Sequence, residues 1–319
     1  MLRTPEPVDP AFRADVLNGL SAPIPAIPAR WFYDRRGSEL FDEITRLPEY
    51  YLTRTETALL KRITPDLAAY AAPGAAVVEF GAGSQTKTPL LLQAIAPRAY
   101  VPVDISGDYL SESADALRSA HPDIEVFPII GDFTRPISLP RAIDGMPRLG
   151  FFPGSTIGNF VPQSATDLLR HFRATLGTGA KLLIGLDRIK PIERLIAAYD
   201  DAAGVTAAFN LNLLARINRE LDADIPIDGF AHEARWNDTQ ARIEMHLVAT
   251  RDLRFEIEGQ VFVFAHGVSI HTENSHKYGP RGSRLLLLAG GWTPVREWLA
   301  PNDEFALVLA EALPERFAP

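Results

Sequence analysis

The sequence has 319 residues, enough for two domains of about 150 residues and for a core that needs no disulfide or metal to stabilise it. It carries 32 Lys and Arg against 40 Asp and Glu, and this net charge of −8 argues against a nucleic-acid-binding protein, which usually presents a basic surface. The lack of cysteine excludes disulfides, thiolate metal sites and cysteine nucleophiles. Because no run of about 18 apolar residues occurs and the N-terminal segment is charged and proline-rich, we expect a cytoplasmic protein with no membrane partner.

The first part of the chain predicts an extended arm with short helices. Six prolines in the first thirty residues favour extended backbone, with one helical patch over 11–20. Apolar residues recur at helical spacing over 38–45 and 53–69. Between them, residues 47–56 are irregular and rich in aromatic and charged side chains.

Strands and helices alternate from Gly74 to Lys190. Short apolar runs bounded by glycine or by charged residues predict parallel strands over 75–80, 99–104, 124–130, 149–154 and 181–187. Helical patterns follow most of these runs. This alternation is typical of an α/β fold with a doubly wound parallel sheet.

The alternation stops after Lys190. One or two long helices are expected over 192–221, followed by antiparallel strands over 241–250, 253–257 and 260–264. A helix over 282–289 and a strand pair over 293–300 and 304–310 end the chain. We therefore expect residues 1–190 plus 277–319 to form one domain with an N-terminal helical arm, and 191–276 to form an inserted mixed α+β substrate or lid domain. A simple division near residue 190 is the alternative.

The loop after the first predicted strand carries Gly81 and Gly83. Glycines at this point permit a tight turn and let a ligand approach the backbone at the start of a helix. A dinucleotide-binding loop requires a third glycine where Thr86 stands, which disfavours a nicotinamide oxidoreductase. The loop resembles the E-x-G-x-G loop of S-adenosylmethionine enzymes, and a turn that binds nothing is the alternative.

Two further strand ends carry groups that suit a nucleoside. Asp104 ends the second strand about twenty residues after Gly83, where a carboxylate can accept hydrogen bonds from both ribose hydroxyls. Asp132 follows the third strand and can accept from an adenine amino group, while Phe133 can pack against the ring. Because all three loops leave the carboxyl ends of strands, the sequence predicts a nucleoside site at that edge.

A resemblance to a known family extends over nearly the whole chain. The strings that carry it are WFYDRRGSELFDEITRLPEYYLTRTE, VVEFGAGSQTKT, GSTIGNF, AYDDAAGVTAAFN, INRELDAD, RIEMHL and TENSHK. In these strings the chain resembles the S-adenosylmethionine-dependent histidine Nα-methyltransferases, which form hercynine in the ergothioneine pathway. GSTIGNF and AYDDAAGVTAAFN are far more specific to that family than the glycine loop.

The resemblance implies a class I methyltransferase-like sheet with S-adenosyl-L-methionine as the cofactor. It implies cofactor contacts in the glycine loop and at the ends of the second and third strands. These positions are Gly81, Lys87, Asp104, Asp132 and Phe133. Gly83, the second glycine of the loop, completes the expected cofactor-binding set.

The resemblance also implies L-histidine as the substrate. Asn159 would hold the α-amino group, Tyr199 the carboxylate, and Glu273 with Ser275 the imidazole. A carboxylate at Glu273 can accept from an imidazole N–H, so the pocket should reject apolar amino acids. Asn274 and His276 flank the serine where small or apolar residues are expected.

Three further residues are implied around the substrate. Tyr33 and Tyr50 would border the pocket, and Met245 would line its side-chain end. The chemistry is displacement at a sulfonium methyl group by an amine, which requires no metal ion. An α-amine with a pKa of roughly 8 is mostly protonated at neutral pH, so a proton must leave before attack. Asn159 can align the amine, and Tyr33, or a water held by Tyr33 and Tyr50, is the expected proton acceptor.

Several polar residues are not assigned to the site. We interpret Arg188 and Lys190 as solvated charges after the fifth strand, and His266, His271 and His276 as structural or surface residues. We expect a monomer. Two alternative functions stay open: an N-methyltransferase acting on a tryptophan-like amine, and a nucleoside-binding regulator without turnover.

Overall fold

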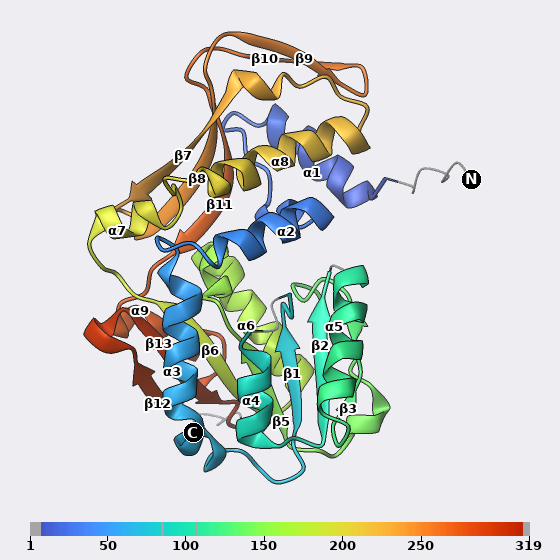
Figure 1. Cartoon of the computed structure of the whole chain (residues 1–319), viewed down its shortest axis with the longest axis vertical. Helices are drawn as coiled ribbons and strands as arrows, with labels where there is room; N and C mark the ends of the chain where they lie inside the picture. The colour runs from blue at the N-terminus through green and yellow to red at the C-terminus, as the bar shows by residue number, and fades with distance from the viewer. Residues whose placement is uncertain (1–7, 84–85, 106, 315–319) are drawn as a thin grey trace, which may run out of the picture. The chain divides into compact units, whose positions relative to one another are not determined.

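The computed structural model describes residues 8–83, 86–105 and 107–314, and their helices and strands are drawn in Figure 1. The described residues form two compact units. Those up to Tyr50 form the first unit together with Pro191–Ser275, and Tyr51–Lys190 form the second with those from His276 onward. We call the first the insertion unit and the second the parallel-sheet unit.

The parallel-sheet unit is built on one large mixed sheet. Its strand order is β12-β13-β6-β5-β1-β2-β3, and β4 also pairs with β2. The parallel strands are β1 (Ala76–Phe80), β2 (Ala99–Asp104), β3 (Glu125–Val126), β4 (Ile129–Ile130), β5 (Arg148–Phe152) and β6 (Lys181–Asp187). At one edge β13 (Phe305–Glu311) runs antiparallel to β6, and β12 (Thr293–Leu299) runs antiparallel to β13.

Helices cover both faces of this sheet, as a doubly wound fold requires. Val77 of β1 is buried in a cluster with residues of α3 (Tyr51–Ala68), α4 (Thr88–Ile95) and α5 (Gly107–Ala120). Phe80 is buried on the opposite face, where its ring stacks at 3.8 Å on Phe172 of α6 (Pro162–Leu176). Helix α9 (Pro280–Ala289) contributes Leu287 to this second cluster. The expected α/β class with a parallel sheet is therefore confirmed.

The third expected strand is divided. The sequence predicts one strand over 124–130, but the structure has β3 and β4, with Phe127 and Pro128 between them. Proline has no backbone N–H and cannot donate to a strand ladder. Both pieces still pair with β2, so Asp132 and Phe133 follow a strand of the sheet as expected.

The insertion unit contains a three-stranded sheet covered by a long helix. The sheet order is β11 (Ser269–His276), β8 (Arg242–Ala249) and β7 (Phe230–Asn237), and α8 (Val205–Glu220) packs across it (Figure 1). A separate hairpin pairs β9 (Leu253–Ile257) with β10 (Gln260–Phe264). The sequence predicts β8, β9 and β10, but not β7 and β11, whose polar composition hides the alternation. The remaining helices of the unit are α1 (Pro10–Ser21), α2 (Arg35–Ile44) and α7 (Ile192–Ala197).

The described residues up to Tyr50 belong to the insertion unit, whereas the sequence assigned all of 1–190 to the other domain. Aromatic packing accounts for the difference: Phe32 lies 4.6 Å from Phe209 of α8, ring centroid to ring centroid. Backbone pairing adds to it, since Ile27 donates its N–H to the His271 carbonyl at 2.9 Å. The N-terminal segment therefore completes the core of the insertion unit.

Among the described residues, five short 3₁₀ helices connect these elements: Ala29–Phe32, Arg141–Ile143, Thr156–Asn159, Ile227–Gly229 and Pro301–Asp303. Of the helices in the part of the chain that the structure describes, none has both the length and the apolar composition to cross a membrane.

Phe209→Ala should destabilise the insertion unit. Phe209 is buried among the rings of Phe32, Tyr33 and Phe41, so truncation leaves a cavity that costs about 3–5 kcal/mol. Denaturant unfolding should show the loss, and limited proteolysis should cut earlier within residues 8–50. Ala208→Ser, at an exposed position of the same helix, is the control. Unchanged stability and proteolysis in Phe209→Ala would contradict this account of the core.

Candidate active site

The glycine loop leaves β1 with its backbone held against β2. The N–H of Gly81 donates to the Val103 carbonyl at 2.8 Å, and Gly81 adopts a φ of +78°, which favours glycine. A methyl group added to Gly81 would lie 3.5 Å from the Phe133 ring, and one added to Gly83 would lie 3.7 Å from an Asp104 carboxylate oxygen. The loop glycines, Asp104 and Phe133 thus lie together as expected. Ser84 and Gln85 of the same loop lie outside the described residues.

The segment after β4 is closed by Asp132 itself. Its Oδ1 accepts from the Thr134 N–H at 2.9 Å and from the Thr134 hydroxyl at 2.6 Å. A carboxylate has further acceptor capacity, so this turn is compatible with a contact to an adenine amino group. Phe133 packs edge-on against Phe152 at 5.6 Å. These residues fit a nucleoside, because they combine a glycine loop, an acidic strand end and an aromatic ring.

Lys87 is held by the carboxylate of Glu56, a residue that the sequence motifs do not assign to the site. Its ammonium forms an ion pair with Glu56 of α3, and both side chains are buried. The Glu56 carboxylate also accepts from the Gly154 N–H at 2.8 Å. A signal for Glu56 was present in the sequence, because it stands in the apolar stripe of α3 between Leu52 and Leu59, where a glutamate is buried only with a partner.

Glu79 lies in β1, two residues before Gly81 of the glycine loop, and is buried. It accepts hydrogen bonds from the Thr88 hydroxyl at 2.8 Å and the Tyr100 hydroxyl at 2.7 Å. Burial raises the pKa of Glu79 to about 7, although these two hydrogen bonds and Lys87 oppose the rise. The carboxyl group is therefore partly protonated near neutral pH.

The turn after β5 carries Asn159 and is tightly held. Ser155 has a φ of +57°, and its hydroxyl accepts from the Asp187 N–H at 2.9 Å. Gly158 donates to the Ser155 carbonyl at 2.8 Å, and a methyl group on Gly158 would lie 2.9 Å from the His276 carbonyl oxygen. Asn159 ends the 3₁₀ helix that follows, so its position depends on these contacts.

A buried charge cluster stands at the end of β6. Asp187 is fully buried, and it accepts from the Tyr51 hydroxyl at 2.6 Å and from the Lys277 ammonium at 2.8 Å. Lys190 contacts the same carboxylate and donates to the Tyr51 hydroxyl at 2.8 Å. Burial would raise the pKa of Asp187, but Lys277 and Lys190 outweigh it and lower that pKa.

The interpretation of Arg188 and Lys190 as solvated charges is wrong. The side chains of both are only 4% exposed. Burial lowers the pKa of Lys190 to about 8, although Asp187 opposes the shift. Arg188 forms an ion pair with Glu297 of β12.

Within the insertion unit, the tyrosines implied for the substrate form a continuous series. The hydroxyls of Tyr199 and Ser275 lie 2.6 Å apart, within hydrogen-bonding distance. The Tyr50 ring lies 6.2 Å from that of Tyr199 and 6.2 Å from Phe41, which in turn lies 5.6 Å from Tyr33. These four implied residues, Tyr33, Tyr50, Tyr199 and Ser275, are thus linked through side-chain contacts.

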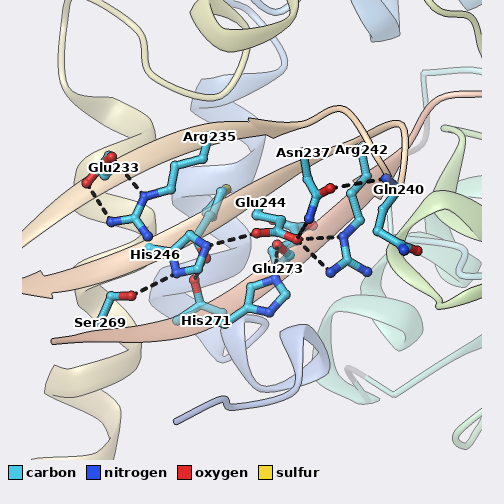
Figure 2. A network of polar contacts seen from close by, with 12 residues as sticks. Glu233, Arg235, Asn237, Gln240, Arg242, Glu244, His246, Ser269, His271 and Glu273 are labelled. Atoms are coloured by element: carbon cyan, nitrogen blue, oxygen red, sulfur yellow. Dashed lines mark hydrogen bonds and ion pairs between the residues drawn. The ribbon is translucent and has the colours of Figure 1, made fainter. Parts of the chain in front are cut away.

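Met245 and Glu273 lie on the neighbouring strands β8 and β11. Met245 is buried, and its carbonyl accepts from the Thr272 hydroxyl at 3.0 Å, which places it beside the residue that precedes Glu273. Figure 2 shows Glu273 among a group of polar side chains from β7, β8 and β11. The strand pairing therefore brings Met245 close to the backbone that carries Glu273 and Ser275.

The polar network of Figure 2 is built from ion pairs and two imidazole rings. Glu244 accepts from Arg242 at 2.6 Å and lies 3.3 Å from the His246 ring nitrogen. The rings of His246 and His271 stack at 4.9 Å, and burial lowers the pKa of both, which leaves them neutral at pH 7.

Glu244, His246 and His271 also place possible metal-ligand atoms within 4.8 Å of one another. The imidazole planes differ by only 16°, so the ring lone pairs do not converge on one point. Arg242 already pairs with the carboxylate. In this arrangement the three residues are bound to one another and to Arg242, and a cation would require at least one ring to turn.

Comparison with known proteins assigns the family. The sequence model of the histidine-specific, S-adenosylmethionine-dependent methyltransferases matches residues 12–312. The chain belongs to this family. It is 41% identical over 313 residues to the histidine N-alpha-methyltransferase of Mycolicibacterium smegmatis and 40% identical over 307 residues to that of Mycobacterium tuberculosis. Each alignment covers 94% of both chains.

One more distant relative and one solved structure are also similar to the chain. Ergothioneine biosynthesis protein 1 of Neurospora crassa is 29% identical over 296 residues, which are 90% of this chain and 33% of that protein. The crystal structure of an S-adenosylmethionine-dependent methyltransferase from Clostridium acetobutylicum superposes with a TM-score of 0.50 at 12% identity, covering 86% of this chain and 99% of that one. The family member described here is therefore a methyltransferase of class I fold that uses S-adenosylmethionine.

Glu79→Gln should remove a pH dependence of stability. The folded pKa of about 7 lies above the ordinary value of 4.5, so this carboxyl group favours the folded state at low pH and loses that contribution as pH rises through 7. Relative to the variant, the wild type should lose up to about 3 kcal/mol of unfolding free energy between pH 5 and pH 8. Denaturant titrations at both pH values measure this difference. Glu112→Gln, at an exposed position, is the control, and an equal pH dependence in Glu79→Gln and the wild type would contradict the assignment.

Proposed function

We propose that the enzyme transfers methyl groups from S-adenosylmethionine to the α-amino nitrogen of L-histidine, giving hercynine, the first step of ergothioneine biosynthesis. The observation that carries the proposal is the contact between the hydroxyls of Tyr199 and Ser275. Ser275 lies on β11 with Glu273, and Met245 lies on the neighbouring strand β8. A hydroxyl pair beside a carboxylate offers acceptors and donors for an imidazole and an amino-acid carboxylate. Family membership supports the same substrate.

Each polar residue has one role in this proposal. Glu273 accepts from an imidazole N–H, and Ser275 serves the other ring nitrogen. Tyr199 donates to the substrate carboxylate, and its contact with Ser275 couples the two ends of the amino acid. Asn159 accepts from the α-amino group through its amide oxygen.

Gly81, Gly83, Lys87, Asp104, Asp132 and Phe133 form the proposed cofactor site. The bound cofactor supplies a methyl group on a positively charged sulfur. The protein contributes positioning and exclusion of water, which lower the barrier to a displacement between two small molecules. Asn159 aligns the amine, and Tyr33, or a water held by Tyr33 and Tyr50, takes the proton that must leave before attack. The monomeric state and the cytoplasmic location stay predictions.

Purified protein incubated with S-adenosylmethionine and histidine should yield mono-, di- and trimethylated histidine in sequence. Mass spectrometry of the reaction mixture measures these products, with tryptophan and leucine as competing substrates. Histidine should be the preferred substrate because its imidazole N–H can donate to the Glu273 carboxylate, whereas an apolar side chain offers that carboxylate no hydrogen-bond donor. No mass gain on histidine, or equal activity on tryptophan, would overturn the proposal.

Glu273→Ala should raise the KM for histidine by about tenfold to a hundredfold, the loss of one hydrogen bond to a charged group. Affinity for S-adenosylhomocysteine, measured by calorimetry, should stay within a factor of about two because Glu273 is not assigned to the cofactor. Glu233→Ala is a matched control, since Glu233 is another carboxylate of the same sheet and pairs with Arg235. Equal effects of the two substitutions on KM would show that Glu273 has no special role.

A further inference from the structure

One buried carboxylate joins helix α3 to two segments that follow different strands of the parallel sheet. Glu56 projects from α3, and its side chain is 0% exposed. It forms an ion pair with Lys87 after β1, and it accepts from the Gly154 N–H after β5 through both oxygens, at 3.1 and 2.8 Å. These are two of the loops to which the cofactor and substrate roles are assigned.

Strand β6 leaves room for this carboxylate because it has a glycine at the point of contact. A methyl group on Gly185 of β6 would lie 2.3 Å from Glu56 Oε1, so a side chain there would displace the carboxylate. Gly154 itself has a φ of +81°, and a methyl group on it would lie 3.7 Å from the Lys87 ammonium nitrogen. Glycine at 185 therefore leaves room for the Glu56 carboxylate, and glycine at 154 adopts the positive φ of the turn whose N–H this carboxylate accepts.

The buried charge of Lys87 requires the negative charge of Glu56 beside it. The Lys87 side chain is only 9% exposed, and a buried ammonium without a counter-charge is strongly unfavourable. Removing the charge of Glu56 alone therefore leaves Lys87 uncompensated, and the lysine must move toward water or another anion. Because Lys87 lies at the end of the glycine loop, such a movement displaces that loop.

We propose that Glu56 is a positioning residue of the transferase. It holds Lys87 in the cofactor loop and the backbone of Gly154, which leads into the turn carrying Asn159, in a fixed mutual arrangement. This inference rests on the proposed function for the role of Asn159, but the link to Lys87 concerns cofactor binding alone. Glu56 contacts neither substrate nor cofactor in this proposal and acts through the two loops.

Calorimetric binding of S-adenosylhomocysteine to the full-length protein is the first test. Glu56→Gln keeps an acceptor for Gly154 but removes the counter-charge of Lys87, and affinity should fall by about tenfold or more. In a Lys87→Met background the same substitution should change affinity by less than about threefold, since the ammonium it holds is gone. An equal loss in both backgrounds would overturn the link through Lys87.

Kinetics supply the second test. Glu56→Gln should lower kcat by about tenfold to a hundredfold, because small displacements of aligned groups cost that much, and should leave the KM for histidine within about twofold. Gly185→Ala, which crowds Glu56 and also approaches Phe305 at 3.0 Å, should act in the same direction without changing either charge. It provides a second measurement if Glu56→Gln yields little folded protein.

Leu60→Ala is the matched control. Leu60 is buried in the same helix α3 and belongs to the apolar core below the sheet, so its truncation lowers the melting temperature without touching the loops. If Leu60→Ala lowers cofactor affinity and kcat as much as Glu56→Gln at a similar loss of stability, Glu56 is only structural and the proposal fails. A wild type that binds S-adenosylhomocysteine but does not methylate histidine would instead overturn the proposed function, and the affinity comparison would still decide the role of Glu56.

Discussion

Charge buried at the carboxyl edge of the parallel sheet has to be neutralised inside the protein, and the loops of the parallel-sheet unit are arranged around that requirement. The Glu56–Lys87 pair stands between the loops after β1 and β5. Asp187, with Lys190 and Lys277, stands at the end of β6. Breaking one partner of such a pair leaves an unpaired buried ion, which costs far more than the pair itself contributes. These pairs therefore hold the loops in one arrangement more than they add stability.

The turn that carries Asn159 is held by the Glu56 carboxylate and by the backbone at the end of β6. Glu56 accepts from the Gly154 N–H where the turn begins, and the backbone N–H of Asp187 donates to the Ser155 hydroxyl. The backbone of His276 packs against Gly158. A short segment with positive φ values at Gly154 and Ser155 is thus fixed from three sides, which suits a residue that must align a reacting amine. The parallel sheet makes these contacts to the turn possible because the carboxyl ends of its strands lie at one edge.

In the insertion unit, packing between aromatic rings holds the segments together, whereas buried ion pairs hold the loops of the parallel-sheet unit. The Tyr33 ring packs against Phe41 and Phe209, and Phe209 also packs against Phe32. Tyr50 connects this group to Tyr199. The N-terminal segment supplies four of these six rings, although its prolines suggest an arm laid on the surface. Sequence periodicity did not reveal this, because contacts between residues 8–50 and α8 depend on which surfaces remain uncovered after the rest of the chain has folded.

The sequence by itself determined the fold class, the nucleoside-compatible strand ends and the family. Buried parallel strands produce apolar runs, and tight strand-to-helix turns require glycine, so both leave local patterns. It did not determine the partners of Glu56 or the burial of Arg188 and Lys190, since a sequence does not show whether a charged residue meets water or a group from another part of the chain. Nor did it show strands β7 and β11, whose polar side chains pair across the sheet. Only the tertiary structure decided these points, because each depends on side chains far apart in the chain that meet after the sheet has formed.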